Sequence, residues 1–325
     1  MIAARRLAAL AFAGMTLVAP VGAQTGYPNR PVKLLVGAVP GGAPDIVARL
    51  LGERFAQLLG QQFVTENRPG AGGTVVPGQL AKMAPDGYSL LVADIGQLVI
   101  APHLSAEASF DPVRDFAAIG LAAVTPLFIV ANTRTTALRS LADLVREARA
   151  NPGRLNYGSS GVGSIHHISM EVFKTALQLD IVHVPFKGSG QSVPALVAGE
   201  VPIGLATLPT VGAFVQSGQV ALLAVTTAAR FPEAPDVPAI AETVKEYDYG
   251  SEIGIVAPAG TPVDVVARLS GALRGALEAP EVRAKLKTLG AVPAWSSPAD
   301  YAENIRANFR KFGEAVKRSG TAVSK

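Results

Sequence analysis

Short apolar runs that alternate with amphipathic helical segments constrain the fold of this chain more than any other feature. The run Lys33–Ala38 predicts a buried strand, and a loop rich in glycine and proline follows it. Apolar residues then recur at helical spacing from Ile46 to Leu59, and Gly60 ends the helix. The alternation continues toward the C-terminus without an internal repeat or a long linker. It predicts an α/β protein with parallel sheets.

The same pattern predicts the remaining strands and helices. The expected strands are Gln62–Glu66, Ser89–Ala93, Leu127–Ala131, Ile181–Val184, Pro202–Ala206, Ala221–Thr226 and Ile253–Ala257. The expected helices are Leu141–Ala150, Ile165–Leu179, Gln191–Ala198, Pro262–Leu277, Glu281–Leu289 and Pro298–Arg318. With 325 residues the chain is long enough for two domains, which we expect to be joined by crossing strands.

Residues 1–23 have the pattern of a secretory signal peptide. Arg5 and Arg6 precede the apolar run Leu7–Val18, and the small residues Val21-Gly22-Ala23 form a cleavage site. The apolar run is too short to span a membrane. Cleavage lowers the net charge from +4 to +2, so the basic composition says little about partners. We therefore expect an exported, periplasmic protein.

Composition excludes several classes of site. The chain has no cysteine, which rules out disulfides and thiolate metal ligands. Aromatic residues make up only 6 % of the chain, which argues against a platform for single-stranded nucleic acid. The adjacent His166 and His167 would diverge by about 100° on a helix and could not share a metal ion. We expect no metal, no cofactor and no nucleic acid.

Two glycine-rich loops lead from a strand into a helix and are the candidate binding elements. A helix start offers N–H groups without helical partners, which suits an anion, and glycine lets those donors approach closely. Asp45 has two interpretations: an acid in the first helical turn that orders the loop, or a side chain facing a ligand donor. The candidate residues are Pro40, Gly41, Gly42, Ala43 and Asp45 in the first loop, and Ser159, Ser160, Gly161, Gly163 and Ser164 in the second.

The enzyme motifs that would fit this fold class are missing from the sequence. There is no G-x-S-x-G elbow, no Walker A motif and no G-x-G-x-x-G at the first helix. Ser160 and His167 are about two helical turns apart, which places them out of direct reach of one another. A hydrolase that uses Ser159 or Ser160 is therefore the weakest of the functions considered.

Motifs along almost the whole chain resemble the substrate-binding proteins of tripartite tricarboxylate transporters, also called the Bug family. In order, these motifs are Tyr27-Pro28, Arg30-Pro31, Pro40–Gly42 with Asp45, Glu66–Gly73, Ala84–Tyr88, Pro102–Leu104, Asp111-Pro112, Asp115-Phe116, Asn151–Gly153, Leu155–Ser159, His183–Gly188, Asp236–Pro238 and Ala257–Pro262. The resemblance implies a type II periplasmic binding-protein fold. In that fold two α/β lobes are joined by two crossing segments, with the ligand cleft between them.

The resemblance also implies a division of the chain and a role for each loop. Lobe one would comprise residues 24–124 and 226–325, and lobe two residues 125–225. Ligand carboxylates would be held by backbone N–H groups of the two glycine-rich loops. Phe186, Lys187 and Gly188 would form a wall of the cleft, whereas Glu66–Gly73 would be structural.

Departures from the family pattern fall where the ligand would be chosen. Asp94 and Gln97 stand where relatives usually carry small or hydroxyl residues, Thr207 lies where an aspartate is common, and Glu252 replaces an aromatic residue. A carboxylate ligand is repelled by further carboxylates. We therefore expect that Asp94 and Glu252 either point to solvent or pair with arginines, or that one or both face the cleft and select a ligand with a cationic or amide end.

Together these features predict a monomeric, non-enzymatic receptor in the periplasm. Its ligand would be a small organic acid, an amino acid or an amide-bearing analogue, delivered to a membrane transporter. The alternative is a receptor of the same kind that signals to a membrane sensor kinase.

Overall fold

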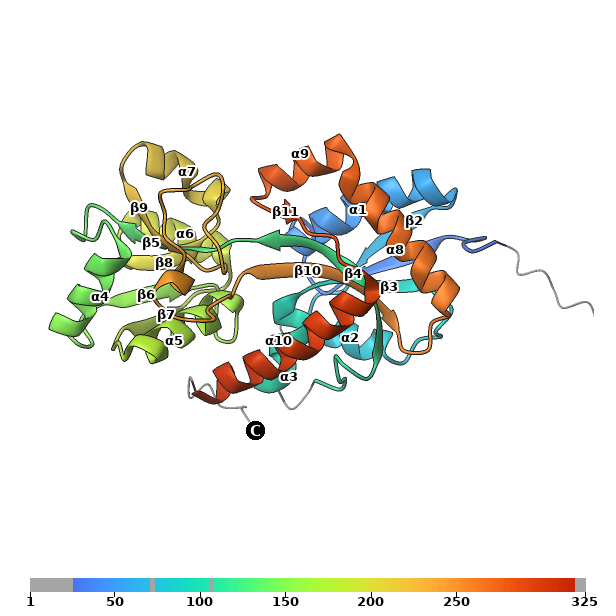
Figure 1. Ribbon diagram of the computed structural model, residues 1–325, viewed down its shortest axis with the longest axis horizontal. Helices are drawn as coiled ribbons and strands as arrows, with labels where there is room; N and C mark the ends of the chain where they lie inside the picture. The colour runs from blue at the N-terminus through green and yellow to red at the C-terminus, as the bar shows by residue number, and fades with distance from the viewer. Residues whose placement is uncertain (1–25, 71–73, 106–107, 319–325) are drawn as a thin grey trace, which may run out of the picture.

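Two separate β-sheets organise the chain into two lobes that lie side by side (Figure 1). The computed structural model describes residues 26–70, 74–105 and 108–318, so the expected signal peptide and its cleavage site lie outside the described residues. The first lobe has a six-stranded sheet in the order β11-β4-β10-β3-β1-β2. The second lobe has a five-stranded sheet in the order β7-β6-β8-β5-β9. This is the two-lobed α/β architecture that the sequence predicts.

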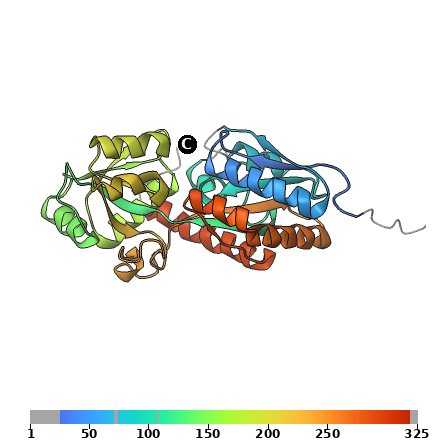
Figure 2. The same ribbon diagram turned by 90° about the horizontal axis from the view of Figure 1, so that it is seen from above.

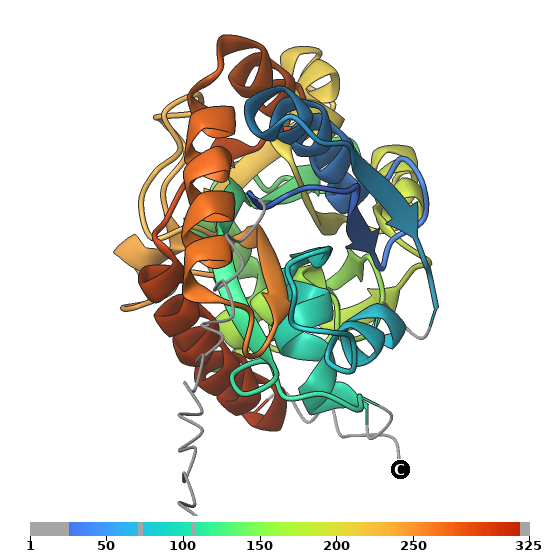
Figure 3. The ribbon, with the colours of Figure 1, turned by 90° about the vertical axis from the view of Figure 1, so that its right-hand side faces the viewer.

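The elements of the first lobe come from both ends of the chain. They are β1 (Val32–Val36), α1 (Ala43–Leu59), β2 (Phe63–Asn67), α2 (Val75–Leu80), β3 (Ser89–Asp94), η2 (Gly96–Ile100), α3 (Ala101–Leu104), β4 (Phe116–Thr125), β10 (Ser251–Pro258), α8 (Val263–Glu278), α9 (Pro280–Thr288), β11 (Val292–Pro293) and α10 (Pro298–Arg318). Helices α1, α8 and α9 pack on one face of the sheet, and α2, η2 and α10 pack on the other (Figure 3).

The middle of the chain forms the second lobe and the segment that leads back from it. The elements are β5 (Phe128–Asn132), α4 (Leu141–Ala150), β6 (Asn156–Ser159), α5 (Ile165–Leu177), β7 (Val182–Pro185), α6 (Ser189–Ala198), β8 (Ile203–Ala206), α7 (Leu208–Gln216), β9 (Val220–Val225) and η3 (Ile240–Glu242). Alternate residues of β5 face opposite sides: Phe128 and Val130 pack toward α6 and α7, and Ile129 and Ala131 belong to the cluster that includes α4 and α5.

The chain crosses between the lobes twice (Figures 1 and 2). It passes from β4 to β5 after Thr125, and it returns from β9 to β10 through residues 226–250. Strand β10 runs antiparallel to β3 and β4, and β5 runs antiparallel to β8 and β9. The sheets are therefore mixed, whereas the alternation of elements predicts parallel ones. The reason is that a chain which leaves a lobe and returns to it places strands of opposite direction at the crossing.

Strand β4 and helix α7 are among the elements that the sequence pattern does not predict. Strand β4 is buried on both faces, with Ala118 and Leu121 in one core cluster and Ile119 and Ala122 in the other, so it shows no alternation. Helix α7 is short and begins with a proline in its first turn. Within the described residues, no helix is both long enough and apolar enough to cross a membrane.

Candidate functional site

Two adjoining cavities lie between the lobes, and residues of both lobes line each of them. The larger has a volume of about 510 Å³ and the smaller about 300 Å³. Residues that line both are Ala43, Pro44, Asp94, His166, Ser189 and Ser251. The shared lining makes the two cavities parts of one interlobe cleft.

The start of α1 forms part of the first-lobe wall of the cleft, and hydrogen bonds of Asp45 hold the loop before the helix in place. The Asp45 carboxylate accepts the N–H of Gly41 at 2.8 Å and the side-chain amide of Asn67 at 2.9 Å, and it pairs with Arg49. Burial alone would raise the pKa of Asp45, but these hydrogen bonds outweigh it and hold the pKa below its usual value. Asp45 orders the loop and lines neither cavity.

The N-terminus of helix α5 lies at the cleft, on the side of the second lobe. Ser164 is its N-cap residue, and the Ser164 hydroxyl accepts the N–H of His167. The N–H groups of Ile165 and His166, at the first two helical positions, have no acceptor within the helix. Because Gly163, Ser164, Ile165 and His166 all line the larger cavity, the positive end of this helix faces the cleft.

Histidine rings fix the loop that precedes α5. Ser159 Oγ lies 2.6 Å from Nε2 of His183, and the N–H of Gly163 donates to Nδ1 of His167. The rings of His167 and His183 stack with their centroids 4.0 Å apart. Burial lowers the pKa of His166, His167 and His183, to about 4 for His166 and for His183, so the rings are neutral at pH 7.

Ser160 pairs with His166 and not with His167. Ser160 Oγ lies 2.6 Å from Nδ1 of His166, whereas the ring of His167 is engaged by Gly163. A pKa of about 4 makes His166 a weak base at neutral pH. The pair therefore braces the loop and is poorly suited to activate a nucleophile.

Asp94 and Gln97 bring polar side chains to the first-lobe side of the cleft. Asp94 ends β3, and Asp94 Oδ1 accepts the N–H of Gln97 at 2.9 Å. Burial raises the pKa of Asp94, and the N–H groups of Gln97 and Gly96 only partly oppose that effect. Gln97 is 8 % exposed and lines the larger cavity.

Glu252 lies on the other face of β10. Its neighbours Ser251 and Ile253 line the smaller cavity, and side chains alternate along a strand. Glu252 instead accepts a hydrogen bond from the side-chain amide of Asn308 in α10. Burial raises the pKa of Glu252, with Lys311 and the amides of α10 opposing the rise. Of Asp94 and Glu252, only Asp94 faces the cleft.

The structure brings about half of the predicted site residues together. Those that line the cleft are Gly41, Ala43, Asp94, Gln97, Ser160, Gly163, Ser164 and Thr207. Those that line neither cavity are Pro40, Gly42, Asp45, Ser159, Gly161, Phe186, Lys187, Gly188 and Glu252. Residues 186–188, expected to form a wall, line neither cavity, whereas the neighbouring Ser189 lines both, and the ring of Phe186 packs against Gly158. His166 and Ser251 line both cavities but are not among the predicted site residues, because no recognisable motif contains them.

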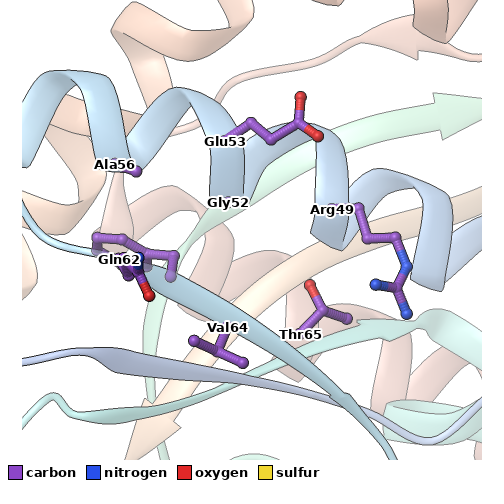
Figure 4. A pocket seen from close by; sticks show the side chains of 8 residues that line it. Arg49, Gly52, Glu53, Ala56, Gln62, Val64 and Thr65 are labelled. Carbon is purple, nitrogen blue, oxygen red and sulfur yellow. The ribbon is translucent and has the colours of Figure 1, made fainter.

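A third hollow lies outside the cleft, between α1 and β2 (Figure 4). Its volume is about 310 Å³, and Arg49 and Glu53 of the helix flank it opposite Val64 and Thr65 of the strand. Strand β2 is the edge of the first-lobe sheet. Because only one lobe builds this groove, lobe movement cannot enclose a ligand there.

Comparison with known proteins agrees with the two-lobed geometry. The family model described as the tripartite tricarboxylate transporter family receptor matches residues 47–321. A UPF0065 protein from the tcbD-tcbE intergenic region of Pseudomonas sp. (strain P51) is 32 % identical over 316 residues, covering 96 % of this chain and 93 % of that protein. Protein BugT of Bordetella pertussis is 30 % identical over 309 residues, covering 94 % of each.

Solved structures show the same fold. The R. palustris protein Rpa4515, solved with adipate, superposes with a TM-score of 0.78 at 33 % identity, covering 91 % of this chain and 99 % of that one. MatC from Rhodopseudomonas palustris, solved with bound malate, gives a TM-score of 0.74 at 30 % identity, covering 89 % and 100 %. The type II periplasmic binding-protein fold is thereby confirmed. The chain belongs to the tripartite tricarboxylate transporter receptor family and is a solute-binding receptor, not an enzyme.

Proposed function

We propose that this receptor captures a small carboxylate-bearing metabolite in the interlobe cleft and presents it to a tripartite tricarboxylate-type transporter. The observation that carries the proposal is the convergence of two helix starts, α1 of the first lobe and α5 of the second, on one cavity. Each start supplies N–H donors and the positive end of a helix dipole. The adipate and malate bound by two related proteins support a carboxylate as the anion.

The cleft binds its ligand by closing. Ligand contacts to both lobes favour the arrangement in which the helix starts approach one another, and the two crossing segments act as the hinge. The ligand class comprises organic acids, amino acids and amide-bearing analogues, and the part beyond the carboxylate meets the walls of the cleft.

The setting of the receptor is part of the proposal. Residues 1–23 act as a cleaved signal peptide, and the receptor works as a monomer in the periplasm. Lobe one comprises 24–124 with 226–325, and lobe two comprises 125–225. The strand order supports this division, since the chain changes sheets after β4 and again after β9.

Calorimetry with matched glycine variants tests the carboxylate site. Gly41 lines the smaller cavity with φ +85°, and nothing lies within 4 Å of an added Cβ. Gly60, at the far end of α1, has φ +71° and equally open space. Both Gly41→Val and Gly60→Val therefore strain the backbone, but only the first places atoms in the cleft.

We expect Gly41→Val to weaken binding of dicarboxylate and amino-acid probes about 10- to 100-fold, the equivalent of one or two hydrogen bonds to a charged group. Gly60→Val should lower the melting temperature and leave the dissociation constant unchanged. Normal binding by Gly41→Val, or equal losses in both variants, would contradict the proposed site.

A further inference from the structure

The walls of the cleft are unbalanced in charge. Among the described residues that line the two cavities, Asp94 is the one acidic side chain, and none is lysine or arginine. The positive contribution to the cleft therefore comes from helix starts, and Asp94 faces the same space as a lone carboxylate. A buried charge without a partner is costly, so proteins pair it with a counter-ion or keep it for a ligand.

Asp94 stands at the carboxyl end of β3, where the strand opens on the cleft. One of its oxygens is engaged, since Oδ1 accepts the N–H of Gln97 at 2.9 Å. The N–H groups of Gln97 and Gly96 hold the side chain in place but do not neutralise it. Burial raises the pKa of Asp94, and the positive charge of a cationic ligand group beside the carboxylate would oppose that effect.

Gln97 supplies a second, independent acceptor. Its side chain is more than nine-tenths buried, and it lines the larger cavity. The Oε1 atom of Gln97 is enclosed and has no hydrogen-bond partner among the described residues. An enclosed carbonyl oxygen without a donor is destabilising, and such atoms are usually satisfied in the functional state.

We propose that Asp94 and Gln97 together select a ligand that carries a protonated amine or a primary amide in addition to its carboxylate. This inference rests on the proposed function, because the carboxylate is held at the helix starts. An ammonium or amide group provides N–H donors for Gln97 Oε1 and for the Asp94 carboxylate. A second carboxylate in the same place would face the charge of Asp94 and leave Gln97 Oε1 without a donor.

The ranking of matched ligands by the unaltered protein is the first test. Calorimetry at pH 7 would compare glutarate with 4-aminobutanoate, glutamate and the monoamide of glutarate, and would repeat the set with the four- and six-carbon homologues. At the best-fitting length, an amine or amide should bind at least about 10-fold more tightly than the plain dicarboxylate, the equivalent of one hydrogen bond to a charged group.

Two substitutions with a matched control form the second test. Asp94→Asn keeps the shape but removes the charge, and it should weaken the amine probe about 30-fold while leaving the dicarboxylate unchanged or tighter. Gln97→Met removes the acceptor at similar length and should weaken the amide probe. Glu252→Gln removes a carboxylate on the neighbouring strand that faces α10, and it should leave the ranking of probes unchanged.

The outcomes separate the two proposals. If dicarboxylates bind as tightly as amines and amides, and Asp94→Asn does not change that ranking, the selection by Asp94 and Gln97 is overturned while carboxylate capture stands. If no carboxylate binds at any length, both proposals fall. Because the ranking is measured on the unaltered protein, the inference can be overturned even if a variant misfolds.

Discussion

A side chain at Gly163 should have two distinct costs: backbone strain, which lowers stability, and an overlap between the lobes, which opposes their closure. Gly163 lies in the second lobe with φ +78°, and a Cβ built on it would overlap Cδ1 of Leu104, which ends α3 of the first lobe. The left-handed backbone costs a non-glycine residue about 1–2 kcal/mol. That strain is present whether the lobes are apart or together. The overlap, by contrast, exists only when α3 and the loop are in contact.

The two costs should appear in different measurements on Gly163→Ala. The strain should lower the melting temperature by roughly 2–8 °C, at 2–4 °C for each kcal/mol. Leu104 can escape the overlap by leaving its preferred rotamer at about 0.5–1.5 kcal/mol. Because this second cost opposes closure, calorimetry with the tightest-binding probe should show an affinity about 2- to 13-fold weaker.

Leu104→Ala, alone and combined with Gly163→Ala, completes the cycle. The double variant should bind the probe as tightly as Leu104→Ala alone, because the overlapping methyl group is gone. Its melting temperature should stay below that of Leu104→Ala, because the backbone strain at residue 163 remains. Unchanged affinity in Gly163→Ala would refute the closure argument. An affinity loss that persists in the double variant would place its cause in the loop and not between the lobes.

Three further predictions concern stability. Asp45→Ala should lower the free energy of unfolding by about 2 kcal/mol at pH 7, and equal stability of the two proteins at that pH would contradict the prediction. Because the pKa of Asp45 is held below 3.8, its contribution to stability is present above pH 3.8 and is lost as the pH falls through the pKa of the folded protein. Burial lowers the pKa of His183 from 6.5 to about 4, so the unfolded chain binds more protons in that interval and the free energy of unfolding should fall as the pH drops from 6.5 to about 4. Denaturant titrations at several pH values should show a weaker dependence of this free energy on pH in His183→Asn, and an unchanged dependence would count against the argument. Gly254→Ala would push a Cβ into the hydroxyl of Tyr301 and should cost about 1–3 kcal/mol, partly recovered by adding Tyr301→Phe, and a wild-type melting temperature would disprove the packing.

The parts of the fold that were predictable from sequence are those with local causes. The helix starts at Ala43 and Ile165 follow from a proline, a glycine-rich loop and a capping serine, all adjacent in the chain. The mixed character of the sheets was not predictable from the same information. It depends on which strands become neighbours at the crossing, and that is decided by the pairing of residues from 72 to 165 positions apart.

The candidate site likewise has parts that local sequence signals predict and parts that depend on strand pairing. Glycine and serine signals located both loops, but the direction of each acid depended on the register of its strand. Asp94 and Ile253 are paired across β3 and β10, which places Glu252 on the opposite face. The contact of Ser159 with His183 likewise arises because β6 and β7 pair in parallel, bringing residues 24 positions apart together.

A crystal structure of the receptor with its tightest-binding acid tests the central claim most directly. We expect the ligand carboxylate to lie between the lobes, with its oxygens about 2.7–3.2 Å from N–H groups at the starts of both α1 and α5. A ligand held by one lobe alone, or bound outside the interlobe cleft, would contradict it.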